Sequence, residues 1–156
     1  MTPRLSYWRL APDTYQKMLD LSAAASSALE PVLVELVKTR VSQINGRAFC
    51  INMHTTALRT AGETEQRIYL LNAWRETSLY SDRERAALAW AEAVTRLPNG
   101  DVPNEVYDHA RSRFSDKELV DLTFVTTTIN AWNRLAISFR PAFAADRQQD
   151  PVAAPG

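Results

Sequence analysis

Apolar side chains recur every three or four positions over several stretches of this chain, which is the period of an amphipathic α-helix. The clearest stretch begins at Pro31 and is followed by Asn45 and Gly46. Proline is common in the first turn of a helix and Asn-Gly is a common stop, so we expect one helix to begin at Pro31 and end before Asn45. Its apolar face consists of Leu33, Leu36, Val37, Val41 and Ile44.

Two later helices carry a capping-box signature at their starts. Ser81 and Ser115 are each followed by a Glu three residues later, and such a pair reciprocally satisfies the exposed amides of a first helical turn. We expect these helices to end before Pro98 and Pro141. A run of threonines from Thr126 lowers the helix propensity of the second one. Further helices are predicted from Asp13 onward and over residues 47–61, 64–75 and 103–113.

The chain is predicted to be all-α. Only four glycines occur among 156 residues, whereas sheet proteins of this size usually need more glycines in their turns. We expect a single domain of about six or seven helices over residues 1–143, with its most informative motifs in residues 31–97. Residues 144–156 contain two prolines and several Gln and Asp, and we predict a disordered tail there.

Composition and charge narrow the classes of partner. Lys+Arg and Asp+Glu both number 18, so no basic excess points to nucleic acid or to an anionic membrane surface. No apolar run approaches 18 residues, and no signal-peptide core follows Met1. One cysteine cannot form an intrachain disulfide. These observations predict a cytoplasmic protein without nucleic-acid or membrane partners.

The candidate chemistry centres on Cys50, near the predicted start of a helix. Arg47 and His54, three residues before and four after, would share its helix face. The unpaired amides and positive dipole end of a helix start favour a thiolate. On spacing alone, however, such a cysteine is more often an apolar core residue. Two ligands are too few for zinc, and His109 is expected to face solvent, so no metal or organic cofactor is predicted.

The segment from Glu35 through His54 resembles the core of the AhpD-like alkylhydroperoxidases, within the carboxymuconolactone decarboxylase family. The pattern of that family is a Glu, eleven residues, and then Cys-x-x-Cys-x-x-x-His. Glu35, Cys50 and His54 match the Glu, the second Cys and the His, and the similarity extends over most of residues 15–140. The resemblance implies a helical bundle that assembles into homo-oligomers, as trimers or hexamers.

One departure from the family pattern changes the expected chemistry. In the family, the second Cys attacks a peroxide, the first Cys resolves the sulfenic acid, and Glu and His relay protons. Arg47 stands where the first Cys would be, so nothing else in the chain can resolve an oxidised Cys50. The resemblance therefore implies a one-cysteine peroxidase that uses a hydroperoxide and an external thiol reductant, with Cys50 as nucleophile, His54 as base and Glu35 in the proton relay.

Two other functions stay open at this stage. A lyase of the decarboxylase branch would use His54 and Glu35 for proton transfer and Arg47 to hold a carboxylate. A redox-inactive oligomeric binding module is the third reading. Arg47 itself has two interpretations: it stabilises a thiolate or binds an anionic substrate group, or it pairs with Glu35 and silences the site.

Overall fold

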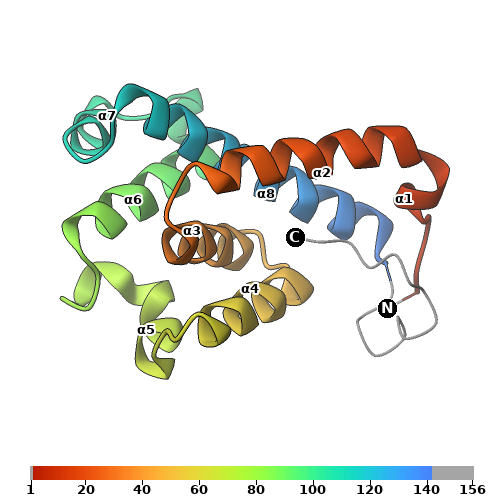
Figure 1. Cartoon of the computed structure of the whole chain (residues 1–156), viewed down its shortest axis with the longest axis horizontal. Helices are drawn as coiled ribbons and strands as arrows, with labels where there is room; N and C mark the ends of the chain where they lie inside the picture. The colour runs from red at the N-terminus through yellow and green to blue at the C-terminus, as the bar shows by residue number, and fades with distance from the viewer. Residues whose placement is uncertain (1, 142–156) are drawn as a thin grey trace.

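The structure is a computed structural model that describes residues 2–141. Within that range the chain forms one helical domain without strands, so the all-α prediction is confirmed (Figure 1). The tail predicted at residues 144–156 lies outside the described residues. No described helix is long and apolar enough to cross a bilayer. The elements are α1 (Tyr7–Leu10), α2 (Pro12–Ser27), α3 (Pro31–Ile44), α4 (Ala48–Thr60), α5 (Glu65–Leu70), the 3₁₀ helix η1 (Leu71–Glu76), α6 (Asp82–Arg96), the 3₁₀ helix η2 (Pro98–Gly100), α7 (Asn104–Arg111) and α8 (Asp116–Phe139).

Helix α3 is the central element of the fold. It contacts α2, α4, α6 and α8, and Figure 1 shows α2 and α8 together on one side of it and α4 on the other. A larger core cluster joins α2, α3, α6 and α8. A smaller one lies between α3, α4, α5, η1 and α6, and its buried residues are Leu36, Leu58, Ile68, Leu71, Trp74, Tyr80 and Leu88. Of the predicted apolar face of α3, Leu33, Val37 and Val41 are buried in the larger cluster and Leu36 in the smaller one, whereas Ile44 is half-buried.

The helix starts predicted from capping boxes are confirmed. Each Ser hydroxyl accepts a hydrogen bond from the backbone N–H three residues later, and the Glu at that position accepts one from the Ser N–H. Helix α8 then continues unbroken through its threonines. Thr126 and Thr128 are buried, and their hydroxyls donate to the carbonyls of Leu122 and Val125. Burial and satisfied hydroxyls outweigh the weak local propensity.

Two details differ from the sequence prediction. The helix expected over residues 64–75 divides into α5 and η1, with a non-helical backbone at Ala73. Long-range hydrogen bonds fix this segment, because the Trp74 indole donates to Glu92 and Arg85 donates to the Trp74 carbonyl. The other difference is α1, a single turn that the sequence did not predict. Both differences come from contacts between distant parts of the chain.

Candidate active site

The turn between α3 and α4 sets the position of the site. Gly46 has φ +67°, a left-handed conformation that glycine adopts without steric cost. Its N–H donates to the Gln43 carbonyl, and the N–H of Arg47 donates to the Ser42 carbonyl. This pair of bonds is a Schellman cap, which ends α3 and lets α4 begin after Arg47. The two helices therefore lie against each other and can share a site.

Three side-chain amides, of which Asn133 is fully buried, fasten this turn to α8. The Asn45 side chain donates to the side-chain oxygens of Asn130 and Asn133, both at 2.9 Å. Asn133 is fully buried and donates to the Ser42 hydroxyl. Because a buried amide is costly when unpaired, these bonds hold the turn in one arrangement. The end of α3 and the start of α4 are thus fixed relative to the rest of the domain.

Helix α4 directs one stripe of side chains inward. Cys50, His54 and Leu58 are spaced by four residues and are its three buried residues. Cys50 occupies the third position of the helix and is 4% exposed, while His54 is 2% exposed. Arg47 is the N-cap residue and provides no side-chain cap to the first turn. The cysteine therefore lies at the positive end of the helix dipole, on the same face as the imidazole.

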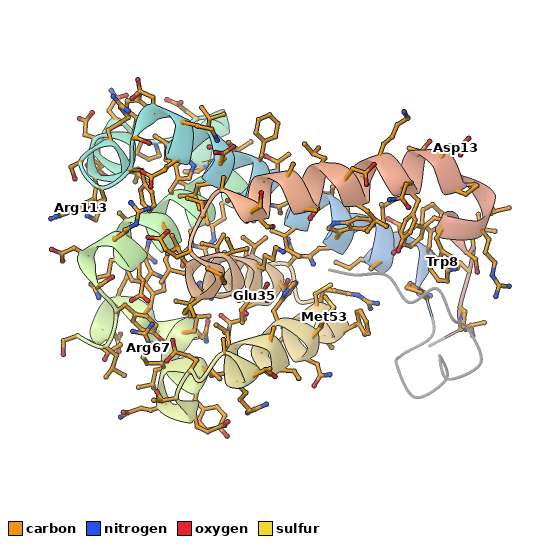
Figure 2. All side chains as sticks on the ribbon, in the orientation of Figure 1. Trp8, Asp13, Glu35, Met53, Arg67 and Arg113 are labelled. Carbon is orange, nitrogen blue, oxygen red and sulfur yellow. The ribbon has the colours of Figure 1, made fainter. Side chains whose placement is uncertain are left out.

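The His54 imidazole is held from α3 by Glu35. Its Nδ1 lies 2.7 Å from Glu35 Oε2, and Figure 2 shows Glu35 on α3, the helix that packs against α4. An ionised carboxylate can only accept, so Nδ1 donates its hydrogen to Glu35, and in a neutral imidazole Nε2 is then an acceptor. Nε2 is buried and has no hydrogen-bond partner among residues 2–141. The site therefore contains an oriented imidazole with an unused basic nitrogen.

Lys38 is a member of this cluster to which sequence reasoning assigned no role. Its Nζ lies 3.9 Å from Glu35 Oε1, and the residue is only 6% exposed. Burial lowers the pKa of Lys38 below 10.5, while the nearby Glu35 carboxylate acts in the opposite direction. The spacing of three residues could have placed Lys38 beside Glu35. Its burial depends on the packing of neighbouring helices and had no local signal.

Arg47 does not form the ion pair that would silence the site. The carboxylate of Glu35 is occupied by His54 and Lys38 instead. The Nε and Nη2 atoms of Arg47 are buried without a hydrogen-bond partner in the part of the chain that the structure describes. Its guanidinium carbon lies 5.9 Å from the centre of the Phe49 ring. Two N–H donors at the start of α4 are therefore available to an anionic group.

Comparison with known proteins decides the family. The model of the carboxymuconolactone decarboxylase family matches residues 12–93, a range that contains Glu35, Cys50 and His54. This chain belongs to that family. The uncharacterised protein YdfG of Bacillus subtilis is 44% identical over 139 residues, covering 88% of this chain and 95% of its own. The uncharacterised protein Rv2313c of Mycobacterium tuberculosis is 31% identical and covers 84% of this chain, which spans about half of that longer protein.

Solved structures with this fold support the AhpD-like assignment within the family. A protein from Agrobacterium tumefaciens superposes with a TM-score of 0.86 at 37% identity, covering 91% of this chain and 98% of its own. It is named as a protein of unknown function and a candidate AhpD antioxidant defence protein. An uncharacterised peroxidase-related protein from a Silicibacter species has a TM-score of 0.72 at 26% identity, with coverages of 86% and 70%.

Other candidate chemistry in this member of the family is limited. His109 is exposed on α7, as predicted, and does not approach His54 within hydrogen-bonding distance. Among the described residues, no group of three or more His, Cys, Asp or Glu side chains is arranged to hold a metal ion.

Proposed function

We propose that this protein is a thiol-dependent peroxidase of the one-cysteine type, acting on small hydroperoxides. One observation carries the proposal: an imidazole held by Glu35 lies one helical turn after Cys50, with its Nε2 unpaired. The names of the similar Agrobacterium and Silicibacter proteins, which refer to antioxidant defence and to peroxidases, support the same class of reaction.

The chemical step needs a base and then an acid. His54 takes the proton of the Cys50 thiol at Nε2, and the resulting imidazolium is stabilised by Glu35. The thiolate attacks one peroxide oxygen, the O–O bond breaks, and Cys50 becomes a sulfenic acid. The departing alkoxide takes the proton from His54 and leaves as an alcohol. One thiol and one hydroperoxide thus give one sulfenic acid and one alcohol, with all atoms and electrons balanced.

The enzyme must then be reduced from outside. Cys50 is the sole cysteine of the sequence, so the chain supplies no resolving thiol. An external thiol attacks the sulfenic sulfur, releasing water and forming a mixed disulfide, and a second equivalent of that thiol restores Cys50 and leaves as its own disulfide. Turnover therefore depends on a small thiol or on a partner protein.

Treating the protein with one equivalent of a hydroperoxide tests the proposal. Mass spectrometry should find one added oxygen on Cys50 in the wild type and none in Cys50→Ala. The variant His54→Asn should react roughly 100-fold more slowly, because it lacks the base. If Cys50 resists oxidation in the folded protein but reacts after unfolding, the redox-inactive binding module becomes the better reading.

A lyase of the decarboxylase branch is the second candidate. The two unpaired Arg47 nitrogens favour it, because a guanidinium matches a carboxylate in charge and geometry. In that reaction His54 and Glu35 would move protons and Cys50 would not change its covalent state. Lactone-acid turnover that survives in Cys50→Ser would support the lyase and contradict the peroxidase.

The lyase candidate gives Arg47 the role of binding an anionic group beside Cys50, and alkylation of Cys50 can measure that binding. Iodoacetate and iodoacetamide react with the same thiolate but differ in charge, so the ratio of their rates reports attraction of the anion. We expect Arg47→Met to lower this ratio roughly tenfold, the effect of one charged hydrogen bond. The control is Arg59→Met, which removes an exposed arginine near the other end of α4. An unchanged ratio in Arg47→Met would show that Arg47 does not bind anions beside Cys50.

A further inference from the structure

Lys38 is an unusual residue for a buried position on the central helix of the fold. It lies on α3 next to the fully buried Val37, and it is 6% exposed, whereas Lys17 and Lys117 are exposed. Lysine is rarely buried unless its charge is paired. The structure gives its ammonium no hydrogen bond within residues 2–141, and its ion pair is the one with Glu35 at 3.9 Å. Packing alone does not explain a cation at this position.

The stability of the fold does not explain it either. The pKa of Lys38 is lowered by burial, so the folded protein holds this proton less tightly than the unfolded chain. A lysine with a depressed pKa costs stability at neutral pH, and the cost disappears only as the pH rises from the folded pKa toward 10.5. An uncharged residue of similar shape should therefore be tolerated or preferred by the fold.

The surroundings of Lys38 connect it to the imidazole. Glu35 uses Oε1 for Lys38 and Oε2 for His54 Nδ1. On its other side, Lys38 lines a cavity of about 350 Å³ next to α2, where Asp20 is the charged group and accepts a hydrogen bond from Gln16. The charged groups that face Lys38 are thus Glu35 on its own helix and Asp20 on α2, with His54 of α4 beyond the shared carboxylate.

We propose that Lys38 is a positioning residue of the thiol site, which acts through Glu35 to weaken the binding of a proton by His54. A second cation on the same carboxylate competes with the imidazolium for its negative charge. Lys38 therefore limits how strongly Glu35 stabilises the imidazolium that forms when His54 takes the Cys50 proton. The purpose of this role rests on the proposed peroxidase function. The electrostatic coupling between Lys38 and His54 does not require peroxidase activity.

NMR titration of the two histidines tests the coupling directly. Loss of the charge in Lys38→Met should raise the midpoint of the His54 titration by roughly 0.5 to 1 pH unit, the size expected for one nearby charge. The conservative variant Lys38→Arg should restore the wild-type midpoint. His109, exposed on α7, is the internal control and should not move in either variant.

A second neutral variant separates charge from packing. Lys38→Gln should shift His54 in the same direction as Lys38→Met, and both should unfold at a denaturant concentration no lower than the wild type. The pH at which the rate of Cys50 oxidation falls on the acidic side should rise together with the His54 midpoint. An unmoved His54 midpoint in both neutral variants, or an equal shift in Lys38→Arg, would overturn the proposal.

The titration also distinguishes this proposal from the peroxidase proposal. If His54 shifts as expected but Cys50 does not react with hydroperoxides, the coupling stands and the peroxidase function falls. If Cys50 reacts and His54 does not shift, the peroxidase stands and Lys38 has no part in it.

Discussion

Two glutamates on neighbouring helices bind cations in contrasting ways. Glu92 on α6 is 3% exposed, and both of its oxygens are fully used. Its Oε1 accepts from Arg40 at 2.7 Å and from the Trp74 indole at 2.9 Å, and its Oε2 accepts from Arg75 at 2.6 Å and from Arg96 at 3.3 Å. Four donors from α3, η1 and α6 thus converge on one carboxylate.

The Glu35 carboxylate on α3 makes fewer hydrogen bonds than the Glu92 carboxylate. It accepts one short hydrogen bond from His54 and has a longer ion pair with Lys38. Nε2 of its partner His54 is buried without a hydrogen-bond partner within residues 2–141, and so are two nitrogens of Arg47 at the start of α4. A fully satisfied buried network is typical of structural rigidity, whereas unsatisfied buried donors and acceptors need another explanation. We infer that the Glu92 cluster holds helices together, whereas the Glu35 cluster is available for chemistry.

The largest expected effect is on the stability conferred by Glu92. Burial disfavours its charge, but hydrogen bonds from Trp74, Arg40 and Arg75 outweigh it and hold the pKa of Glu92 below 4.5. Glu92→Gln would leave the buried Arg40 without a counter-charge, and we expect a loss of about 3 to 5 kcal/mol in the free energy of unfolding. Urea denaturation at neutral pH measures this loss.

The lowered pKa of Glu92 also predicts how the stability difference between wild type and Glu92→Gln changes with pH. A carboxylate with a lowered pKa stabilises the fold above pH 4.5, and this contribution is lost as the pH falls through the folded pKa. The difference between wild type and Glu92→Gln should therefore narrow below pH 4.5. Glu76→Gln is the control, because Glu76 is exposed and should change stability by less than about 0.5 kcal/mol. A gap that stays constant into acid would contradict this account of Glu92.

The corresponding substitution Glu35→Gln is expected to affect the rate of Cys50 oxidation more than the stability of the fold. The neutral amide of Glu35→Gln cannot stabilise an imidazolium, so oxidation of Cys50 by a hydroperoxide should slow roughly 10- to 100-fold. The free energy of unfolding should fall by less than in Glu92→Gln. The variant removes the counter-charge of Lys38, but that ion pair spans 3.9 Å and the Glu35 side chain is 21% exposed. Stopped-flow oxidation and urea denaturation of the same sample provide both values.

Equal stability losses in Glu35→Gln and Glu92→Gln would break the comparison, since both clusters would then be structural. The same Glu76→Gln variant serves as the rate control and should react like the wild type.

Local chemistry explains why much of the fold could be predicted from the sequence. A capping box needs only a Ser and a Glu three residues apart, and Gly46 ends α3 through its own backbone conformation. The misses depend on distant groups. The chain before α1 is held at Arg4, whose N–H donates to the Phe139 carbonyl, and the Tyr7 ring lies 5.8 Å from the Phe139 ring. No pattern near residue 7 encodes a contact with the far end of α8.

The site shows the same division between local and distant information. The spacing of Cys50 and His54 fixed their shared helix face, and the family resemblance supplied Glu35. The burial of Lys38 and the unpaired state of Arg47 depend on how α2, α3 and α4 pack, and one sequence does not contain that information. Sequence reasoning therefore named Cys50, His54, Glu35 and Arg47 as candidates, but it gave Lys38 no role.

The turn between α3 and α4 has a consequence for how this protein could change over evolutionary time. Backbone groups and Gly46 close the turn, and the Arg47 side chain contributes no cap to it. The hydrogen bonds that close the turn therefore do not depend on which side chain stands at position 47. A thiol in place of the guanidinium would stand one turn before Cys50, and the chain is thus a single amino-acid exchange away from the two-cysteine arrangement.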